Sequence, residues 1–320
     1  MKPGLLPTMG IPQELSLARF WTPRYWPTWV LWLAMQTTAR LPFSWLRPIG
    51  KLLGKALSRL KRRERRTAER NLEVCFPELS SAERTRLLEL HFEAVGMSFL
   101  EMAIGWFWPI ERLLQVVRIE GREHLDAGLA RGNGVILFAA HFTTLEVGVA
   151  VLEALWSRCS CMYRPQRNAM MDVMIRRGRT RFAKEQIPRD NVRTLLRNLR
   201  DNFAVVYLPD QTYLGKQSEL LPFFGEPAVT NIATSKLAKI SGAIVLPYFF
   251  RRLADGSGYV VDIGAPLPNF PSDDAALDTR RLVARLEEYI RAAPEQYLWL
   301  YKKFKSRPEP YPDLYRNQPG

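Results

Sequence analysis

Two hydrophobic spacings alternate along this chain. Short apolar runs rich in Val, Ile, Phe and Cys are typical of buried strands, and longer stretches repeat apolar residues with helical spacing. The expected strands are residues 134–140, 159–163, 204–209, 243–249 and 258–263. The expected helices are 81–108, 146–155, 169–182, 190–200, 231–240 and 276–292. This rhythm predicts one α/β domain with a mostly parallel central sheet flanked by helices.

The N-terminal part has a different pattern. Residues 25–39 form an uncharged stretch rich in Trp between Arg24 and Arg40. It is short for a spanning helix, which needs about 20 apolar residues, and its Trp and Tyr suit the headgroup layer. A basic flank follows, with Arg47, Lys51, Lys55, Arg59, Lys61, Arg62, Arg63, Arg65 and Arg66. We expect a membrane-associated helix that either spans the bilayer or lies on it, although an ordinary buried helix would also fit.

These patterns divide the chain into three parts. Residues 1–66 are the expected membrane-anchoring and basic helical segment, and residues 67–306 the α/β domain. The Pro-rich residues 307–320 are expected to form a poorly ordered tail.

Composition narrows the possible partners. The chain has 46 Lys and Arg against 32 Asp and Glu, a net charge of +14. Such an excess favours an anionic membrane surface, a phosphorylated substrate, an acidic carrier protein or nucleic acid. No zinc-finger, helix-turn-helix or RNA-binding motif is present, which argues against nucleic acid. Cys75, Cys159 and Cys161 indicate a reducing compartment, and we expect the latter two to be core residues and not metal ligands.

The strand 134–140 leads directly into His141, and Glu146 follows in the first turn of the next helix. Thr143 or Thr144 can cap that helix. We expect Glu146 to accept a proton from one imidazole nitrogen and to leave the other as a base. A lone histidine after a strand is often only a turn or core residue. The other two, His91 and His124, lie in sequences that suit structural or solvated roles.

Polar residues follow two further strands. Arg164 follows strand 159–163, and Asp210 and Gln211 follow strand 204–209. Because parallel strands end at one edge of a sheet, these residues should converge with His141.

Together these segments carry a family resemblance. The spacing His141-x4-Glu146 resembles the HX4(D/E) signature of membrane-associated glycerolipid acyltransferases. The wider set resembles one branch, the late acyltransferases of lipid A biosynthesis (lauroyl and myristoyl transferases). The matching segments are residues 23–26, 70–78, 106–109, 141–146, 163–165, 208–211 and 293–299. Residues 222–225 read Pro-Phe-Phe-Gly where phosphatidic-acid acyltransferases have Phe-Pro-Glu-Gly, which disfavours a glycerol-phosphate acceptor.

The resemblance implies a single glycerolipid-acyltransferase-like domain at the cytoplasmic face of a cell inner membrane. It implies transfer of an acyl chain from acyl carrier protein to a hydroxyl on an acyl chain of a lipid A precursor, without a metal or organic cofactor. His141 would be the general base, oriented by Glu146, because an alcohol is a poor nucleophile. Arg164 would stabilise the thioester oxyanion, unless it pairs with Asp210.

The other residues expected to bind substrate are Asn168, Asp210, Gln211, Arg176 and Arg179. Two alternatives stay open. One is a lysophospholipid or glycerol-phosphate acyltransferase, which would use the same chemistry on another acceptor. The other is a non-catalytic lipid-binding membrane protein.

Overall fold

The computed structural model describes residues 16–180, 185–212 and 214–316. A seven-stranded sheet has the order β1-β9-β8-β2-β5-β3-β4. The bounds of its strands are β1 (Val117–Glu120), β2 (Val135–Phe138), β3 (Cys159–Tyr163), β4 (Glu185–Pro188), β5 (Ala204–Tyr207), β8 (Ile244–Arg252) and β9 (Tyr259–Ile263). Only the β8–β9 pairing is antiparallel. The prediction of a mostly parallel sheet is therefore confirmed.

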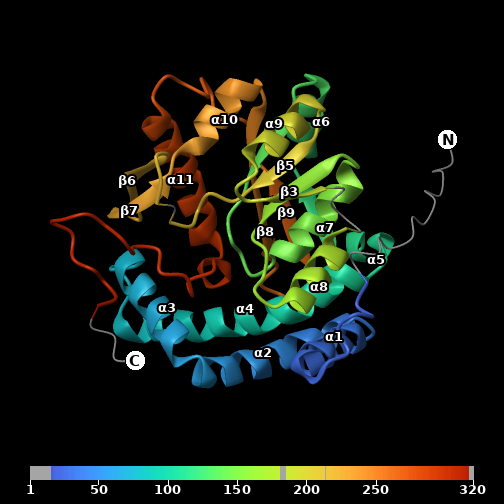
Figure 1. Cartoon of the computed structure of the whole chain (residues 1–320). Coiled ribbons are helices and arrows are strands. Elements are labelled where there is room, and N and C mark those ends of the chain that lie inside the picture. The colour runs from blue at the N-terminus through green and yellow to red at the C-terminus, as the bar shows by residue number, and fades with distance from the viewer. Residues whose placement is uncertain (1–15, 181–184, 213, 317–320) are drawn as a thin grey trace.

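Helices flank this sheet (Figure 1). Their bounds are α1 (Trp26–Thr38), α2 (Phe43–Leu60), α3 (Arg62–Cys75), α4 (Ser81–Phe107), α5 (Ile110–Leu114), α6 (Arg122–Ala130), α7 (Leu145–Leu155), α8 (Ala169–Arg179), α9 (Val192–Arg200), α10 (Ala233–Ser241) and α11 (Ala275–Ala292). The five expected strands and six expected helices of the α/β domain are all present. Helix α8 ends at Arg179, and the remainder of its expected range includes Phe182, which lies outside the described residues.

Four further strands have no clear signal in the sequence. The edge strands β1 and β4 are each four residues long, and β4 carries polar residues. The strands β6 (Ser218–Phe223) and β7 (Glu226–Asn231) form a separate antiparallel hairpin. The Pro-Phe-Phe-Gly segment comprises the last two residues of β6 and the turn, where Phe224 and Gly225 have positive φ. Polar edge strands lack the continuous apolar run by which buried strands are recognised.

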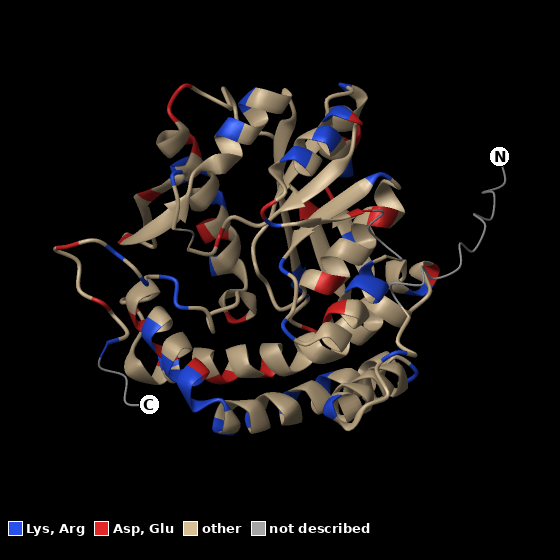
Figure 2. Ribbon diagram, viewed as in Figure 1, with Lys and Arg blue, Asp and Glu red and all other residues tan. Residues whose placement is uncertain are grey.

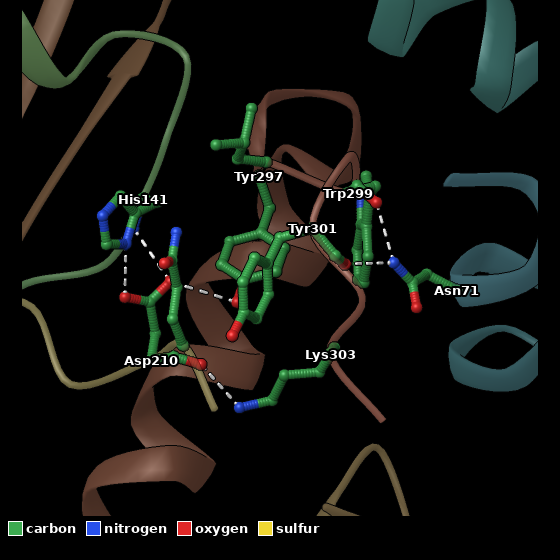
Figure 3. A pocket seen from close by; sticks show the side chains of 9 residues that line it. Asn71, His141, Asp210, Tyr297, Trp299, Tyr301 and Lys303 are labelled. Atoms are coloured by element: carbon green, nitrogen blue, oxygen red, sulfur yellow. Dashed lines mark hydrogen bonds and ion pairs between the residues drawn. The ribbon is translucent and has the colours of Figure 1, made fainter. Parts of the chain in front are cut away.

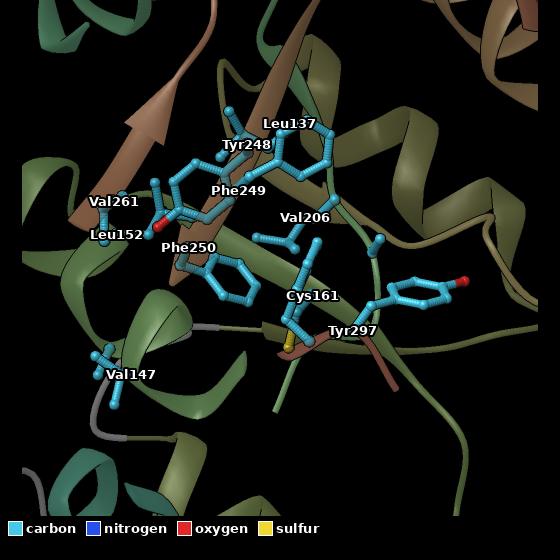
Figure 4. Close-up of a cluster of buried hydrophobic side chains, with 14 of the residues drawn as sticks. Leu137, Val147, Leu152, Cys161, Val206, Tyr248, Phe249, Phe250, Val261 and Tyr297 are labelled. Atoms are coloured by element: carbon cyan, nitrogen blue, oxygen red, sulfur yellow. The ribbon is translucent and has the colours of Figure 1, made fainter. Parts of the chain in front are cut away.

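The centre of the sheet is a continuous apolar core. All residues of β2 are buried, as expected of a parallel strand covered on both faces. Figure 4 shows Leu137 of β2 and Val206 of β5 among the aromatic rings of β8. Helix α7 approaches β8 closely because Gly148 faces the ring of Phe250, and the Tyr248 hydroxyl donates to the Gly148 carbonyl at 2.6 Å. Cys159 and Cys161 are buried in β3, which confirms them as core residues.

The N-terminal helices form an outer layer beneath α4, on the side away from the sheet (Figure 1). Helix α2 packs against α4 through glycines. A Cβ atom on Gly96 would lie 2.1 Å from the Gly50 carbonyl oxygen and 2.4 Å from the Gly54 nitrogen. Only hydrogen at these positions permits this separation of the two backbones. In the described part of the chain, no helix combines the length and the apolar character that crossing a bilayer requires.

The C-terminal segment differs from the expectation of a poorly ordered tail. The side chain of Arg307 and the whole of Tyr315 are buried. The Tyr315 hydroxyl donates to the side-chain oxygen of Asn71 in α3 at 2.5 Å. Phe304 donates its backbone N–H to the same hydroxyl at 3.1 Å. The prediction was wrong as far as Arg316, because one tyrosine in this Pro-rich segment finds a buried polar partner on a distant helix.

The α2–α4 contact gives a stability prediction. Gly96→Ala should lower the free energy of unfolding by about 3 kcal/mol, because the added methyl group collides with backbone atoms that cannot rotate away. Denaturant titration of the purified protein measures this loss. The matched control is Ala56→Ser on the exposed side of α2, which should change stability by less than about 0.5 kcal/mol. A Gly96→Ala variant as stable as the control would contradict the packing described.

Candidate active site

The loop that follows β2 carries His141 and is held on both sides. The Ala139 backbone N–H donates to the Tyr207 carbonyl of β5 at 2.9 Å. From the other side, the Thr143 backbone N–H donates to the Gln296 carbonyl at 2.8 Å, and the Leu298 backbone N–H donates to the His141 carbonyl at 2.9 Å. We call residues 294–298, which include the short helix η3 (Pro294–Gln296), the strap. The strap fixes the backbone on either side of the imidazole.

The strap is itself anchored to α4. His91 donates from Nδ1 to the Glu295 carbonyl at 2.9 Å. Burial lowers the pKa of His91 to about 4, so this histidine is neutral at physiological pH. His124 contacts the Ile263 carbonyl through Nδ1 at 2.9 Å. Both contacts fit the structural roles expected for these two histidines.

The imidazole of His141 pairs with Asp210, which follows β5. Their Nδ1 and Oδ1 atoms lie 2.7 Å apart, and the His141 backbone N–H donates to Oδ2 at 3.0 Å. Figure 3 shows the other ring nitrogen pointing away from the carboxylate. The His141 side chain keeps 29% of its surface exposed, against 1% for Asp210. The pair thus has a buried acid and an accessible imidazole nitrogen, the arrangement of a general base and the group that orients it.

The electrostatics of the pair favour an ionised acid beside a basic imidazole. Burial acts to lower the pKa of His141, but the charge and hydrogen bond of Asp210 outweigh it, so the pKa is raised above its ordinary value. Burial raises the pKa of Asp210, and His141 more than compensates, so that pKa is lowered. The positive charge of Arg179 has a smaller effect that opposes that of Asp210 and acts to lower the pKa of His141. Asp210 therefore stabilises the protonated imidazole that forms when His141 takes a proton.

The Glu146 carboxylate has partners other than His141. Its carboxylate accepts hydrogen bonds from Arg179 of α8 and from Trp106 Nε1 of α4, the latter at 2.8 Å. Glu146 is the second residue of α7, where its side chain faces these neighbouring helices, whereas His141 lies in the preceding loop. The acid that contacts the imidazole is Asp210, so the expected His141–Glu146 contact is wrong.

The Glu146–Arg179 pair joins three helices. Side-chain exposure is 11% for Glu146 and 15% for Arg179. Close approach of α4 to its neighbours depends on two glycines: a Cβ on Gly105 would meet the Glu146 carbonyl at 2.9 Å, and one on Gly178 would meet the Trp106 ring at 2.3 Å. Burial raises the pKa of Glu146, and the adjacent guanidinium outweighs it, so the pKa is lowered and the carboxylate stays ionised.

The helix that follows His141 is not capped as the sequence suggested. Thr144 occupies the N-cap position of α7, but its side chain makes no capping hydrogen bond. Its hydroxyl donates instead to the Phe250 carbonyl of β8 at 3.0 Å. Thr144 therefore ties the start of α7 to the sheet.

The remaining predicted residues differ in their surroundings. Gln211 lines the same pocket as His141. Arg164 is exposed after β3, and Asp210 pairs with His141 and not with this arginine.

Asn168 caps α8 through its side-chain oxygen and donates to the Thr28 hydroxyl at 3.1 Å, which joins α8 to α1. Arg176 accepts a hydrogen bond from Gln186 on its carbonyl, so its backbone supports β4.

Two residues around Asp210 carried no signal as site residues in the sequence. The Tyr297 hydroxyl donates to Asp210 Oδ2 at 3.2 Å. Lys303 is buried, and its ammonium donates to the Asp210 carbonyl at 2.6 Å. Burial lowers the pKa of Lys303, and the charge of Asp210 opposes this effect. Lys303 lies in a run of basic residues typical of a surface, so only the fold reveals its position.

The pocket at the pair is narrow. Its walls are Asn71, His141, Asp210, Gln211, Tyr297, Leu298, Trp299, Tyr301 and Lys303, most of them labelled in Figure 3. The empty space between these side chains is about 230 Å³.

The His141–Asp210 pair gives a prediction for titration. The pKa of His141 should lie above its ordinary value near 6.5, and Asp210→Asn should lower it because the charge that stabilises imidazolium is removed. NMR of the imidazole signals measures both values. The chain has three histidines, so His91→Gln and His124→Gln variants assign the spectrum. An unchanged His141 pKa in Asp210→Asn would contradict the pairing.

The Glu146–Arg179 pair gives a prediction for stability. Glu146→Gln should destabilise the fold by about 3–5 kcal/mol, because it leaves a buried guanidinium without a counter-charge. Thermal or denaturant unfolding measures the loss. The control is Glu89→Gln, which removes an exposed partner of Arg86 and should cost less than about 1 kcal/mol. Equal effects of the two substitutions would contradict a buried ion pair.

The sequence matches known proteins over most of its length. Residues 16–306 match the family described as bacterial lipid A biosynthesis acyltransferase. Among similar proteins, the lipid A biosynthesis lauroyltransferase of Escherichia coli (strain K12) is 37% identical over 92% of this chain and 96% of its own length. The palmitoleoyltransferase of lipid A biosynthesis from the same organism is 38% identical over 95% of this chain and 99% of its own length. The lipid A biosynthesis myristoyltransferase of that organism is 28% identical over 89% of this chain and 88% of its own length. The resemblance inferred from the sequence is confirmed, and the chain belongs to the bacterial lipid A biosynthesis acyltransferases.

Proposed function

We propose that this enzyme transfers a fatty acyl chain from acyl carrier protein to a hydroxyl on an acyl chain of a lipid A precursor, with His141 as the general base. The observation that carries the proposal is the His141–Asp210 pair, in which Asp210 holds Nδ1 and the other ring nitrogen is left for a substrate proton.

The reaction follows from the chemistry of the two substrates. The acceptor hydroxyl attacks the thioester carbonyl, and His141 Nε2 takes its proton during the attack. The imidazolium that forms lies beside ionised Asp210. When the tetrahedral intermediate collapses, the carbon–sulfur bond breaks and His141 returns the proton to the leaving thiolate. Asp210 plays the part that the acid plays in a hydrolase triad.

The thioester oxygen becomes an oxyanion during attack and needs a fixed positive group. We assign this role to Arg179, because the Glu146 carboxylate holds its guanidinium in a fixed position. Glu146 then acts as a positioning residue for Arg179. Arg164, exposed at the end of β3, is assigned to substrate binding at the outer part of the site, together with Gln211.

Charge supports the two proposed substrates. Acyl carrier proteins are acidic and lipid A precursors carry phosphates, so the net charge of +14 favours binding of both. Lipid acceptors reside in a bilayer, and we place the enzyme at the cytoplasmic face of the inner membrane. The three buried cysteines suit the reducing compartment on that side.

Turnover of site variants tests this proposal. His141→Ala should lower kcat by about 10³-fold or more, and Asp210→Asn by roughly 10²–10⁴-fold, measured with acyl carrier protein thioester and a lipid A precursor that bears free acyl hydroxyls. In the unmodified enzyme kcat/KM should rise with pH through the raised pKa of His141, because only neutral imidazole accepts a proton. Asp210→Asn should move that rise to lower pH.

Two controls accompany this measurement. His124→Ala removes a histidine outside the site and should retain turnover, and circular dichroism confirms that each variant is folded. Lysophosphatidic acid serves as the competing acceptor. Near-normal turnover of His141→Ala, or a preference for lysophosphatidic acid, would contradict the proposal.

A further inference from the structure

Strand β8 runs on beyond its pairing with β2. It pairs with β2 as far as Pro247 and continues to Arg252, and along this last part β9 lies on one side only. We call the side of residues 248–252 that faces away from β9 the open edge. Backbone groups of successive residues point to alternate sides of a strand. Pro247 and Leu253 form hydrogen bonds with residues that flank β9, so the backbone groups of Phe250 and Arg252 point to the open edge.

Two residues that hold the His141 loop bind the open edge through their side chains. The Thr144 hydroxyl donates to the Phe250 carbonyl at 3.0 Å. The Arg252 N–H donates to Gln296 Oε1 at 2.7 Å, and Gln296 Nε2 donates to the Arg252 carbonyl at 3.0 Å. The amide of Gln296 thus makes the two hydrogen bonds that a residue of a neighbouring strand would make.

The orientation of this amide is fixed by a third hydrogen bond. Gln296 is 3% exposed, and its Nε2 atom also donates to Glu295 Oε1 at 2.9 Å. Turning the amide over would bring its NH2 group against the Arg252 N–H and its oxygen against two acceptors. Only the observed orientation therefore satisfies all three contacts.

The end of β8 is itself anchored to α4. Helix α4 carries acidic residues along its length (Figure 2), and one of them, Glu101, binds the Arg252 guanidinium through two hydrogen bonds of 2.7 and 2.8 Å. Side-chain exposure is 1% for Glu101 and 13% for Arg252. A buried bidentate pair of this kind fixes the geometry of both partners. The open edge is therefore a rigid base for the groups that bind it.

The backbone of the same glutamine binds the loop after β2. The Gln296 carbonyl accepts the Thr143 N–H at 2.8 Å, and the next residue, Tyr297, forms an antiparallel bridge with Phe142. The Tyr297 hydroxyl in turn donates to Asp210. A shift of Gln296 would therefore displace the loop that carries the base and a hydrogen-bond partner of the acid together.

We propose that the open edge of β8 positions His141 for acyl transfer, with Gln296 and Thr144 as the positioning residues that connect this edge to the His141 loop. Gln296 is not among the described residues that line the pocket, so its effect on the reaction passes through the loop. The inference deepens the proposed function and rests on its assignment of His141 as the base.

Gln296→Met tests this role, because methionine keeps the length of the side chain and removes its three hydrogen bonds. With acyl carrier protein thioester and a lipid A precursor, kcat should fall by about 10²-fold and KM should change by less than about twofold, since a small misplacement of a catalytic group slows the chemical step. The pKa of His141, measured by NMR of the imidazole, should fall toward its ordinary value as the contact with Asp210 weakens.

The matched control is Asn202→Ala. The Asn202 amide also joins two backbone groups, because it accepts the Gly134 N–H at 3.0 Å and donates to the Leu129 carbonyl at 3.1 Å, at the end of β2 opposite His141. This variant should lose stability and keep both its kcat and the pKa of His141. If Gln296→Met resembles the control in both measurements, Gln296 has only a structural role and the proposal is overturned.

Thr144→Val is a milder change that applies even if Gln296→Met does not fold. Valine has nearly the shape of threonine, and the substitution removes the hydrogen bond to the Phe250 carbonyl. We expect kcat to fall by about tenfold with little change in KM. The control Thr279→Val removes a buried hydroxyl that binds the Ala275 carbonyl within α11 and should keep kcat. Equal kcat values in these two variants would overturn the proposal.

NMR separates this inference from the proposed function, since it reports the imidazole whether or not acyl chains are transferred. If His141→Ala retains turnover while Gln296→Met lowers the pKa of His141, the proposed function fails and the positioning stands. If His141→Ala loses turnover while Gln296→Met keeps both kcat and the pKa of His141, the positioning fails and the proposed function stands.

Discussion

The contact between His141 and Asp210 is the interaction on which the site depends. It joins the loops after β2 and β5, which are neighbouring parallel strands, and the acid also binds the backbone N–H of the same histidine. One carboxylate therefore fixes both the position and the protonation of the imidazole. Burial of that carboxylate would be costly if it were unpaired. The Tyr297 hydroxyl also donates to it, and the Lys303 ammonium donates to the Asp210 backbone carbonyl.

The rest of the fold keeps this contact in place. The strap closes over the His141 loop and is tied to α4 through His91. Helix α4 also receives α2 on one side and the Glu146–Arg179 pair on another. The same long helix thus links the base, the candidate oxyanion group and the N-terminal helix α2. Its glycines at 96 and 105 permit these close approaches, which larger residues would prevent.

Much of the fold was predictable because its central strands are continuous apolar runs and its helices are amphipathic. The position of His141 after a buried strand and its convergence with Asp210 also followed from the rule that parallel strands end at one edge. The prediction for Glu146 was wrong because closeness along the chain does not determine which neighbouring element a side chain faces. Glu146 is near His141 in the chain, yet it faces Arg179 and Trp106. Likewise, nothing local in a run of lysines indicates that Lys303 is buried, or that Tyr315 is the partner of Asn71.

A double-mutant cycle on kcat tests the central claim most directly, since two residues that act as a unit lose catalysis together. Asp210→Asn should greatly slow acyl transfer in the unmodified enzyme. In the His141→Ala background the same substitution should cause little further loss, because Asp210 acts on the reaction through the imidazole. If the two losses multiply as independent effects, Asp210 does not work through His141, and the account of the site is contradicted.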